Sequence, residues 1–244
     1  MKLLWNAICY QPIYNALVLL ISFMPWGDVG LAIIVLTIIV KLILFPISQK
    51  SIKSQAKLKN LDGEIKKIKE KYPAKEDQAK KTMELYKENK VNPFSGCLLL
   101  LIQFPIIIAL YLVFYKELSF NADILYSFVH VPSVINMKFL GLIDMQSKSL
   151  ILALLAGASQ YLQAVVSMPK NTTPTGPSKS FKDELAKNMG SQMKYFLPIF
   201  VAFISYQISA AIALYWFISN MFTVGQEIYV RRKMKKEGVL VIKQ

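Results

Sequence analysis

The sequence predicts an all-α polytopic membrane protein in which five transmembrane helices form a bundle. Three observations support this fold class. Hydrophobic residues make up 54% of the 244 residues, and several uncharged stretches approach or exceed the roughly 18 residues that a membrane-spanning helix needs. The formal charge of +14 is concentrated in segments between and after these stretches. No remaining segment is long enough for a large soluble domain.

The basic segments predict the orientation of the chain. Residues 50–90 hold 13 lysines against seven acidic residues, residues 170–194 hold five against two, and the tail from Arg231 holds six basic residues against one. The segment 116–148 holds three lysines and three acidic residues. Because Lys and Arg are enriched on the cytoplasmic side, the basic segments should lie inside and 116–148 outside. The N-terminus is then outside and the C-terminus cytoplasmic, and charge clustered in this way does not indicate specific DNA binding.

The largely apolar run 195–230 is expected to contain two spans. It has 36 residues, and a continuous helix of that length would measure about 54 Å, well beyond the roughly 30 Å of hydrocarbon. The chain should therefore turn back near Gln207–Ala211. The complete prediction places the spans at 29–48, 92–115, 149–168, 195–209 and 210–230, with a cytoplasmic helical hairpin at 49–91, an outer loop at 116–148, a cytoplasmic loop at 169–194 and a cytoplasmic tail at 231–244.

Residues 1–28 precede the first span and are predicted to contain an interfacial helix. The apolar run Pro12–Met24 has only 13 residues, fewer than the roughly 20 of a transmembrane helix. A Pro-Trp-Gly sequence then interrupts it, and Trp favours the headgroup region. A cleaved signal peptide is the alternative, but Met1–Gln11 has one lysine and no clear small-residue cleavage site, which disfavours cleavage.

The basic segment 49–91 should form two helices that separate at Tyr72–Pro73, because a proline disfavours helix at the preceding residue. Its apolar positions are few among many lysines, so the hairpin should be mobile. One interpretation is a solvated loop that only sets the topology. The other is an arm that docks anionic headgroups, acidic chains or another protein.

Lys41 is the only charged residue in the first span. A cation at the centre of a membrane helix costs about 2.5 to 3.5 kcal/mol on insertion scales. Lys41 could reach toward the inner headgroups, because Ser48 lies only about 10 Å further along the helix. The alternative is a hydrated cavity, and Thr37, which lies one turn earlier on the same face, favours it.

Two further spans carry polar residues at helical spacing. Such stripes could simply form hydrogen bonds between helices, which are worth about 0.6 to 2 kcal/mol each. With Thr37, Lys41 and Ser48 in the first span, three spans carry such stripes and one stripe includes a cation. One shared polar groove explains them more simply than three separate packing contacts. Glu227 complicates this interpretation, because its carboxylate could pair with Lys41. The stripes consist of Ala156, Gln160, Gln163 and Ser167 in the third span and of Trp216, Asn220, Thr223 and Glu227 in the fifth.

No enzymatic reaction is apparent in the sequence. The only histidine, His130, has no nucleophile or metal partner nearby in the outer loop. Phosphate-binding loops are absent, so no site for nucleotide hydrolysis is expected. Cys9 and Cys97 are too few and too far apart for a metal site or a disulfide framework. We therefore expect neither an enzyme nor a cofactor or metal.

Three segments resemble the YidC/Oxa family of membrane protein insertases. They are GLAIIVLTIIVKLILFPIS at 30–48, VNPFSGCLLLLIQFPIIIALY at 91–111 and ALYWFISNMFTVGQEIYV at 213–230. Their order around a basic hairpin is highly specific, and the match runs nearly from end to end. The large periplasmic domain of many Gram-negative members is missing, so the chain resembles a compact bacterial form.

The resemblance implies five core helices around a groove that opens to the cytoplasm and to lipid, in a bacterial plasma membrane. It implies insertion and folding of small membrane proteins, alone or beside the Sec translocon, without cofactors, with ribosome contact through the basic tail as a further candidate. Lys41 matches the groove cation, which is commonly arginine, and Gln160 and Trp216 match groove-lining positions. Further candidate lining residues are Thr37, Gln103, Gln163, Asn220 and Thr223.

The resemblance has two departures. Lysine keeps the charge of the usual arginine but loses the planar fork that binds a carboxylate in two places. Ser209, Ala210 and Ala211 stand where the family commonly has a Pro-Ala-Gly turn. Other classes also remain open: a small transporter or anion channel with Lys41 as its substrate site, or a membrane anchor for an RNA-rich particle.

Overall fold

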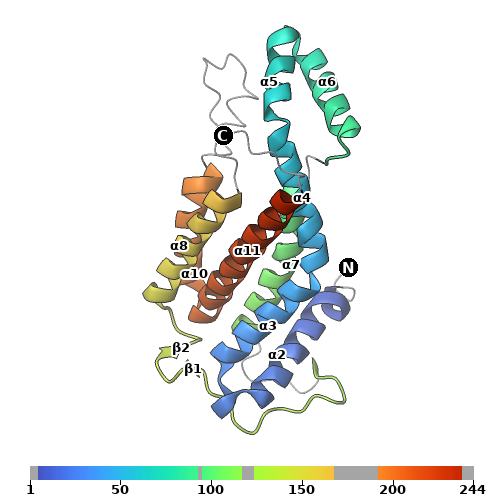
Figure 1. Cartoon of the computed structure of the whole chain (residues 1–244). Helices are drawn as coiled ribbons and strands as arrows, with labels where there is room; N and C mark the ends of the chain where they lie inside the picture. Colours follow the sequence, from blue (N-terminus) through green and yellow to red (C-terminus); the bar gives the residue numbers. More distant parts are fainter. Residues whose placement is uncertain (1–4, 93–94, 117–123, 168–191, 238–244) are drawn as a thin grey trace. The chain divides into compact units, whose positions relative to one another are not determined.

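The computed structural model describes residues 5–92, 95–116, 124–167 and 192–237 (Figure 1). These residues are mostly helical and include a single two-stranded sheet. The predicted cytoplasmic loop 169–194 and the last residues of the predicted tail lie largely outside the described residues. The chain divides into two compact units, of which the first comprises residues 1–43 and 103–224 and the second residues 44–102 and 225–244.

The first unit is a helical bundle. A π-helical turn, η1 (Asn6–Tyr10), leads into its first long helix, and a 3₁₀ turn, η2 (Pro25–Gly27), follows that helix. Its core contains buried residues of five helices and of the loop 124–149. The helices that contribute to the unit are α2 (Gln11–Phe23), α3 (Val29–Ile43), α8 (Leu150–Ser167), α10 (Leu197–Ile208) and the larger parts of α7 (Ser95–Lys116) and α11 (Ala210–Lys236).

The helix before the first predicted span is longer than expected. Residues Asn6–Phe23 form an apolar helical segment of 18 residues. Its buried face, which includes Tyr14, Leu17 and Val18, joins the core against α3. By length and apolar content this segment also meets the requirement for a transmembrane helix, so its interfacial placement stays a prediction.

The predicted spans differ from the observed helices mainly at their ends. In place of one helix at 29–48, α3 ends at Ile43 and α4 begins at Phe45. Pro46 explains the break, because it lacks a backbone N–H and disfavours helix at the residue before it. The turn expected near Gln207–Ala211 coincides with extended Ser209 (φ −166°, ψ 160°). At the other end of α11, residues 231–236 of the predicted tail are helical.

The number of spans stays a prediction. Among the described residues, Asn6–Phe23 and α8 are each long and apolar enough to cross a membrane. The broken pair Val29–Ile43 and Phe45–Leu58 meets the same requirement as one segment, and Gln103–Phe114 and Lys194–Ile208 are apolar but shorter.

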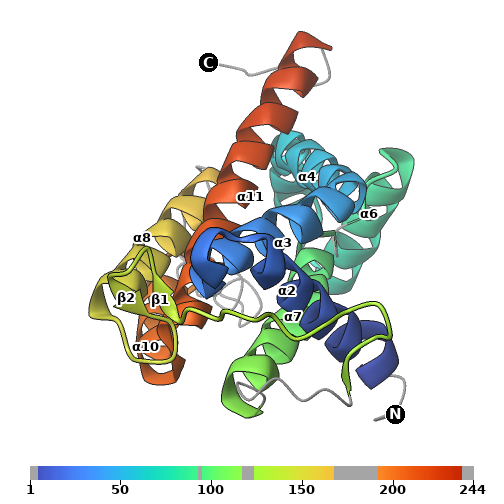
Figure 2. The same ribbon diagram turned by 90° about the horizontal axis from the view of Figure 1, so that it is seen from below.

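Helices α8 and α10 pack closely along their length, as Figures 1 and 2 both show. Gly157 makes this approach feasible. A Cβ atom at this position would lie 2.8 Å from the Cβ of Ala202 and 3.0 Å from the carbonyl oxygen of Pro198. Small residues of this kind let membrane helices approach each other.

The second unit contains the helical hairpin. Its helices are α4 (Phe45–Asn60), α5 (Asp62–Lys71) and α6 (Lys75–Glu88), and α5 and α6 separate at Tyr72–Ala74. Leu61, Leu85 and Val91 form its small core. Met83, an apolar residue of α6, is exposed and does not join this core. Nearer the end of α11, Ile52 and Ala56 of α4 pack with Val230 and Met234.

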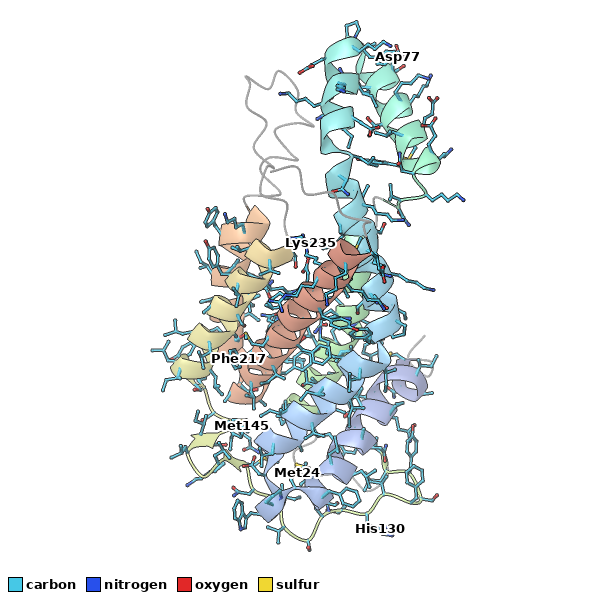
Figure 3. All side chains as sticks on the ribbon, viewed as in Figure 1. Met24, Asp77, His130, Met145, Phe217 and Lys235 are labelled. Atoms are coloured by element: carbon cyan, nitrogen blue, oxygen red, sulfur yellow. The ribbon has the colours of Figure 1, made fainter. Side chains whose placement is uncertain are left out.

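The loop before α8, which is predicted to lie outside, carries a short antiparallel pair, β1 (Lys138–Phe139) and β2 (Ile143–Asp144). Met145 directly follows β2 and is fully buried in the core of the first unit, whereas His130 lies exposed on the loop (Figure 3). The loop is also bound to the break between α10 and α11. There, the N–H groups of Ala210 and Ala211 donate to the carbonyls of Ser147 and Met145 at 2.8 and 3.1 Å.

Asp28 joins the loop to the start of α3. This buried carboxylate accepts hydrogen bonds from the N–H of Leu31 at 3.0 Å and from the N–H of Leu140 at 2.8 Å. The first caps α3 and the second holds the β1–β2 turn. Asn136 adds two backbone bonds, accepting from Val29 at 3.0 Å and donating to Gly27 at 2.9 Å. We call these contacts the Asp28 clasp.

Removal of the clasp carboxylate should destabilise the first unit. Asp28→Ala leaves the N–H groups of Leu31 and Leu140 without their acceptor, and loss of a helix cap alone costs about 0.5 to 2 kcal/mol. We expect a lower melting temperature in detergent and faster proteolysis in residues 124–149. Asp144→Ala is the control, because Asp144 accepts a bond from the exposed Gln146 N–H at 3.0 Å. Equal losses in the two variants would contradict the role of the clasp.

Candidate functional site

Lys41 lies in the last turn of α3 and is half-buried. Its Nζ donates to Oε1 of Gln103 on α7 at 3.3 Å and to Oγ1 of Thr223 on α11 at 3.1 Å. Both acceptors are neutral. Among the described residues of the first unit, no carboxylate lies within ion-pair distance of this ammonium. Within the first unit, the described residues therefore hold this cation with neutral partners only.

The Gln103 amide has a defined orientation. Its Nε2 donates to the Tyr215 hydroxyl and, at 3.3 Å, to Oγ of Ser219, both on α11. An amide nitrogen only donates and an amide oxygen only accepts. Since the two hydroxyls take the nitrogen, the oxygen faces Lys41. We call Lys41, Gln103, Tyr215, Ser219 and Thr223 the Lys41 cluster.

Thr223 is oriented by its own helix. Its hydroxyl donates to the Ser219 carbonyl at 2.8 Å, which leaves oxygen lone pairs to accept from Lys41. An ammonium has three N–H groups, and two of those of Lys41 are used by Gln103 and Thr223. One N–H of Lys41 is thus available to an incoming acceptor such as a carboxylate.

The other predicted groove residues are arranged differently. Thr37 is buried, and its hydroxyl donates to the Ile33 carbonyl of its own helix at 2.6 Å, so it is not part of the cluster. Asn220 links α11 to α8 through a 3.1 Å bond from its Nδ2 to Oγ of Ser159. The half-buried residues Gln160, Gln163 and Trp216 have no side-chain hydrogen bond to the described residues.

Glu227 belongs to the second unit, whereas Lys41 belongs to the first. Arg231, one turn further along α11, donates to Oε1 of Glu227 from Nε at 3.0 Å and from Nη2 at 2.7 Å. The carboxylate is buried and the guanidinium partly exposed. The pair of Lys41 with Glu227 stays a prediction.

The sequence reasoning missed Tyr215, Ser219 and Ser159. A signal for the first two was present, because Tyr215, Ser219 and Thr223 follow each other at intervals of four residues. The predicted stripe began one residue later, at Trp216, and therefore ran along a neighbouring face of the helix. Ser159 has no comparable signal beyond its place beside Gln160.

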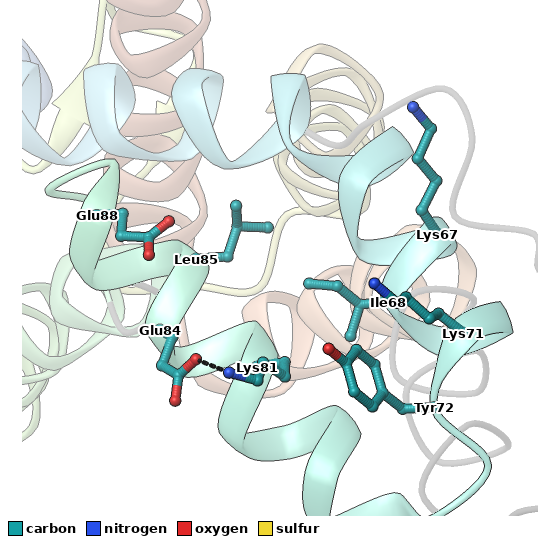
Figure 4. A pocket seen from close by; sticks show the side chains of 8 residues that line it. All are labelled: Lys67, Ile68, Lys71, Tyr72, Lys81, Glu84, Leu85 and Glu88. Atoms are coloured by element: carbon teal, nitrogen blue, oxygen red, sulfur yellow. Dashed lines mark hydrogen bonds and ion pairs between the residues drawn. The ribbon is translucent and has the colours of Figure 1, made fainter.

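The hairpin contains a cavity of about 300 Å³ between α5 and α6 (Figure 4). Lys81 donates to Glu84 at 2.6 Å in an exposed pair, and this hydrogen bond raises the pKa of Lys81 above its ordinary value. The Lys71 ammonium lies 5.8 Å from the centre of the Tyr72 ring. The lining combines an apolar base with more lysines than glutamates and consists of Lys67, Ile68, Lys71, Tyr72, Lys81, Glu84, Leu85 and Glu88.

Known proteins share both the sequence and the fold. The family model of the 60 kDa inner membrane protein matches residues 21–237. A membrane protein insertase YidC of Clostridium tetani is 34% identical over 217 residues, which are 88% of this chain and 86% of the relative. The corresponding protein of Clostridium acetobutylicum is 38% identical over 205 residues, which are 81% of this chain and 71% of the relative.

Longer relatives match over the same region. The Wolinella succinogenes membrane protein insertase YidC is 32% identical, and the match covers 86% of this chain but 34% of that protein. A crystal structure described as an active YidC insertase with its first transmembrane domain resolved superimposes with a TM-score of 0.52 at 25% identity. That match covers 81% of this chain and 40% of the solved chain. With a family model spanning most of its length and such relatives, the chain belongs to the YidC/Oxa family of membrane proteins.

Proposed function

We propose that the chain is a membrane protein insertase that helps small membrane proteins to enter and fold in the bilayer. Two relatives that match over 86% and 71% of their own length carry this name. The single observation that carries the mechanism is the Lys41 ammonium, held between three helices by neutral oxygen atoms. Such a cation is uncompensated and can attract an acidic client segment.

The energetics of the cluster support a cation that stays within the bundle. A cation at the centre of a membrane helix costs about 2.5 to 3.5 kcal/mol. A hydrogen bond from a charged group contributes about 1.5 to 3 kcal/mol, so the bonds to Gln103 and Thr223 are together sufficient to offset that cost. Lys41 therefore does not need to reach the headgroups to be tolerated.

The proposed mechanism lowers the barrier to moving a polar tail into the membrane. A hydrated groove beside the Lys41 cluster reduces the desolvation of that tail. Lys41 attracts its acidic residues, and the apolar segment of the client then moves along α8 and α11 into lipid, past Gln160, Gln163, Asn220 and Trp216. Burial of the apolar segment in hydrocarbon drives the step, so no cofactor is needed.

The same proposal includes the orientation and the partners. The excess of Lys and Arg in the hairpin, the 170–194 segment and the tail supports a cytoplasmic C-terminus and an outer N-terminus. Membrane lipids and newly made small membrane proteins are the expected partners, with the Sec translocon and the ribosome as further candidates. The cavity between α5 and α6 gives the hairpin a surface with which to dock acidic chains.

Substitution of Lys41 should affect clients according to their charge. In vesicles that contain only this protein, Lys41→Arg should insert a small membrane protein with an acidic tail, whereas Lys41→Ala and Lys41→Glu should insert it poorly. Protease protection of the tail measures insertion. A client whose tail lacks acidic residues is the control and should be affected much less, since it gains no attraction from the cation.

Two outcomes would contradict this mechanism. Equal insertion of the acidic client by the wild type and Lys41→Glu would show that attraction by the cation is dispensable. Solute or anion flux through the same vesicles without insertion would indicate a transporter or channel. Both measurements use the full chain in one lipid preparation. The melting behaviour of each variant in detergent separately detects a failure to fold.

Gln103 should be required to hold Lys41 as a cation that no carboxylate neutralises. Gln103→Glu keeps the shape but sets a carboxylate against the ammonium, so the variant should fold and yet insert acidic-tailed clients poorly. Gln103→Met removes the acceptor of Lys41 and the donor to Tyr215 and Ser219, and should lower the free energy of unfolding by about 1 to 3 kcal/mol.

Gln160→Met is the matched control for stability, because Gln160 has no side-chain hydrogen bond to the described residues. Its melting temperature in detergent should remain close to that of the wild type. Wild-type insertion of an acidic-tailed client by Gln103→Glu would refute the requirement for an uncompensated cation.

A further inference from the structure

The outer end of the first unit exposes apolar side chains that its core does not use. Trp26 is 78% exposed, Leu140 58% and Leu142 85%. Trp26 lies in the turn between α2 and α3, and both leucines lie in the turn between β1 and β2. We call these three residues the outer tip.

The two segments of the outer tip are held together. Asp28 follows Trp26 by two residues and accepts the Leu140 N–H at 2.8 Å. Asn136 pairs with the backbone of Gly27 and Val29. Gly27 is required for this approach, because a Cβ atom there would lie 2.2 Å from the Val134 carbonyl oxygen. The turn of β1–β2 is thus fixed beside the start of α3, as Figures 1 and 2 show.

Trp26 and Leu140 both have strained backbones. Their φ angles are 56° and 50°, in the left-handed region that glycine and asparagine tolerate far better than large apolar residues. Neither side chain is buried, so packing within the chain does not compensate for the strain. Strain of this kind is retained where the surroundings or the function of a segment require it.

We propose that the outer tip inserts into the headgroup region of the outer leaflet and anchors the outer loop to the lipid surface. Tryptophan favours this region because its ring is apolar and its N–H is polar. Lys138 is exposed at the base of the turn and can reach lipid phosphates. On the Trp26 side, the exposed Leu19 and Phe23 of α2 continue the apolar surface.

The size of the surface favours lipid over a protein partner. A stable protein interface involves about 20 to 30 residues on each side, whereas the tip and its flanks present only a few side chains. A lipid surface needs no such complementary area, and each apolar group that leaves water contributes independently. This inference depends on α2 and α3 lying in a membrane but not on insertase activity, so either proposal can fail alone.

Tryptophan fluorescence tests the proposal directly. The chain has three tryptophans, Trp5, Trp26 and Trp216. In the full-length variant Trp5→Phe/Trp216→Phe, reconstituted in phosphatidylglycerol and phosphatidylethanolamine vesicles, Trp26 should show blue-shifted emission and little quenching by acrylamide. Lipids brominated near the headgroup end of their acyl chains should quench it more than lipids brominated near the methyl end.

Two variants separate lipid contact from fold. Leu142→Asp should reduce the quenching by brominated lipid and shift the Trp26 emission to the red, and the high exposure of Leu142 keeps the risk to folding small. Gln146→Asp adds the same charge to an exposed position of the same loop and should leave the quenching unchanged. Strong acrylamide quenching with no effect of bromine, or a blue shift that requires an added protein, would overturn the proposal.

Discussion

A cation surrounded by apolar helices is tolerated when neutral oxygen atoms stabilise it, and it remains reactive when no carboxylate neutralises it. Gln103 and Thr223 supply such oxygen atoms to Lys41, and no carboxylate among the described residues of the first unit lies within ion-pair distance of it. The Gln103 amide can present its oxygen to the ammonium only because Tyr215 and Ser219 accept from its nitrogen. Apolar replacements in α11 would therefore affect the charge on α3 through the amide on α7. The hydrogen bonds of the Lys41 cluster therefore depend on one another.

Hydrogen-bond partners are equally important at the end of the first unit where α3 begins. Backbone groups that are buried away from water need partners within the protein, because an unpaired N–H or C=O is costly. The Asp28 clasp supplies them at the start of α3, and Asn15 accepts from the Tyr126 N–H at 2.7 Å while donating to the Ile124 carbonyl at 3.0 Å. Polar side chains of the helices thus form hydrogen bonds with backbone groups of the loop. The loop in turn places Met145 in the core of the first unit. The loop is an integral part of this unit.

Sequence patterns could predict a mostly helical membrane protein and single out Lys41 as a candidate, because hydrophobic length, charge distribution and a lone lysine in an apolar run are all local signals. They could not determine how far each helix is rotated. The series Tyr215, Ser219 and Thr223 begins one residue before the predicted stripe that starts at Trp216. A shift of one residue is within the width of a helical face. Contacts between distant segments, such as Asp28 with Leu140 or Asn220 with Ser159, leave no periodicity. Met83 illustrates a third limit, since an apolar residue in a short basic helix need not face its thin core.

In the proposed mechanism, lysine at the centre of the cluster suits a site that must release the client carboxylate that it attracts. Arginine would offer a planar fork of five donors and could bind a client carboxylate in two places. Lysine has three donors, and in this cluster two are used by Gln103 and Thr223. A client carboxylate can then form one directed bond along with its Coulomb attraction. A contact of that kind lowers the barrier to entry while leaving the carboxylate free to exchange with water, which is the balance that a passing polar tail requires.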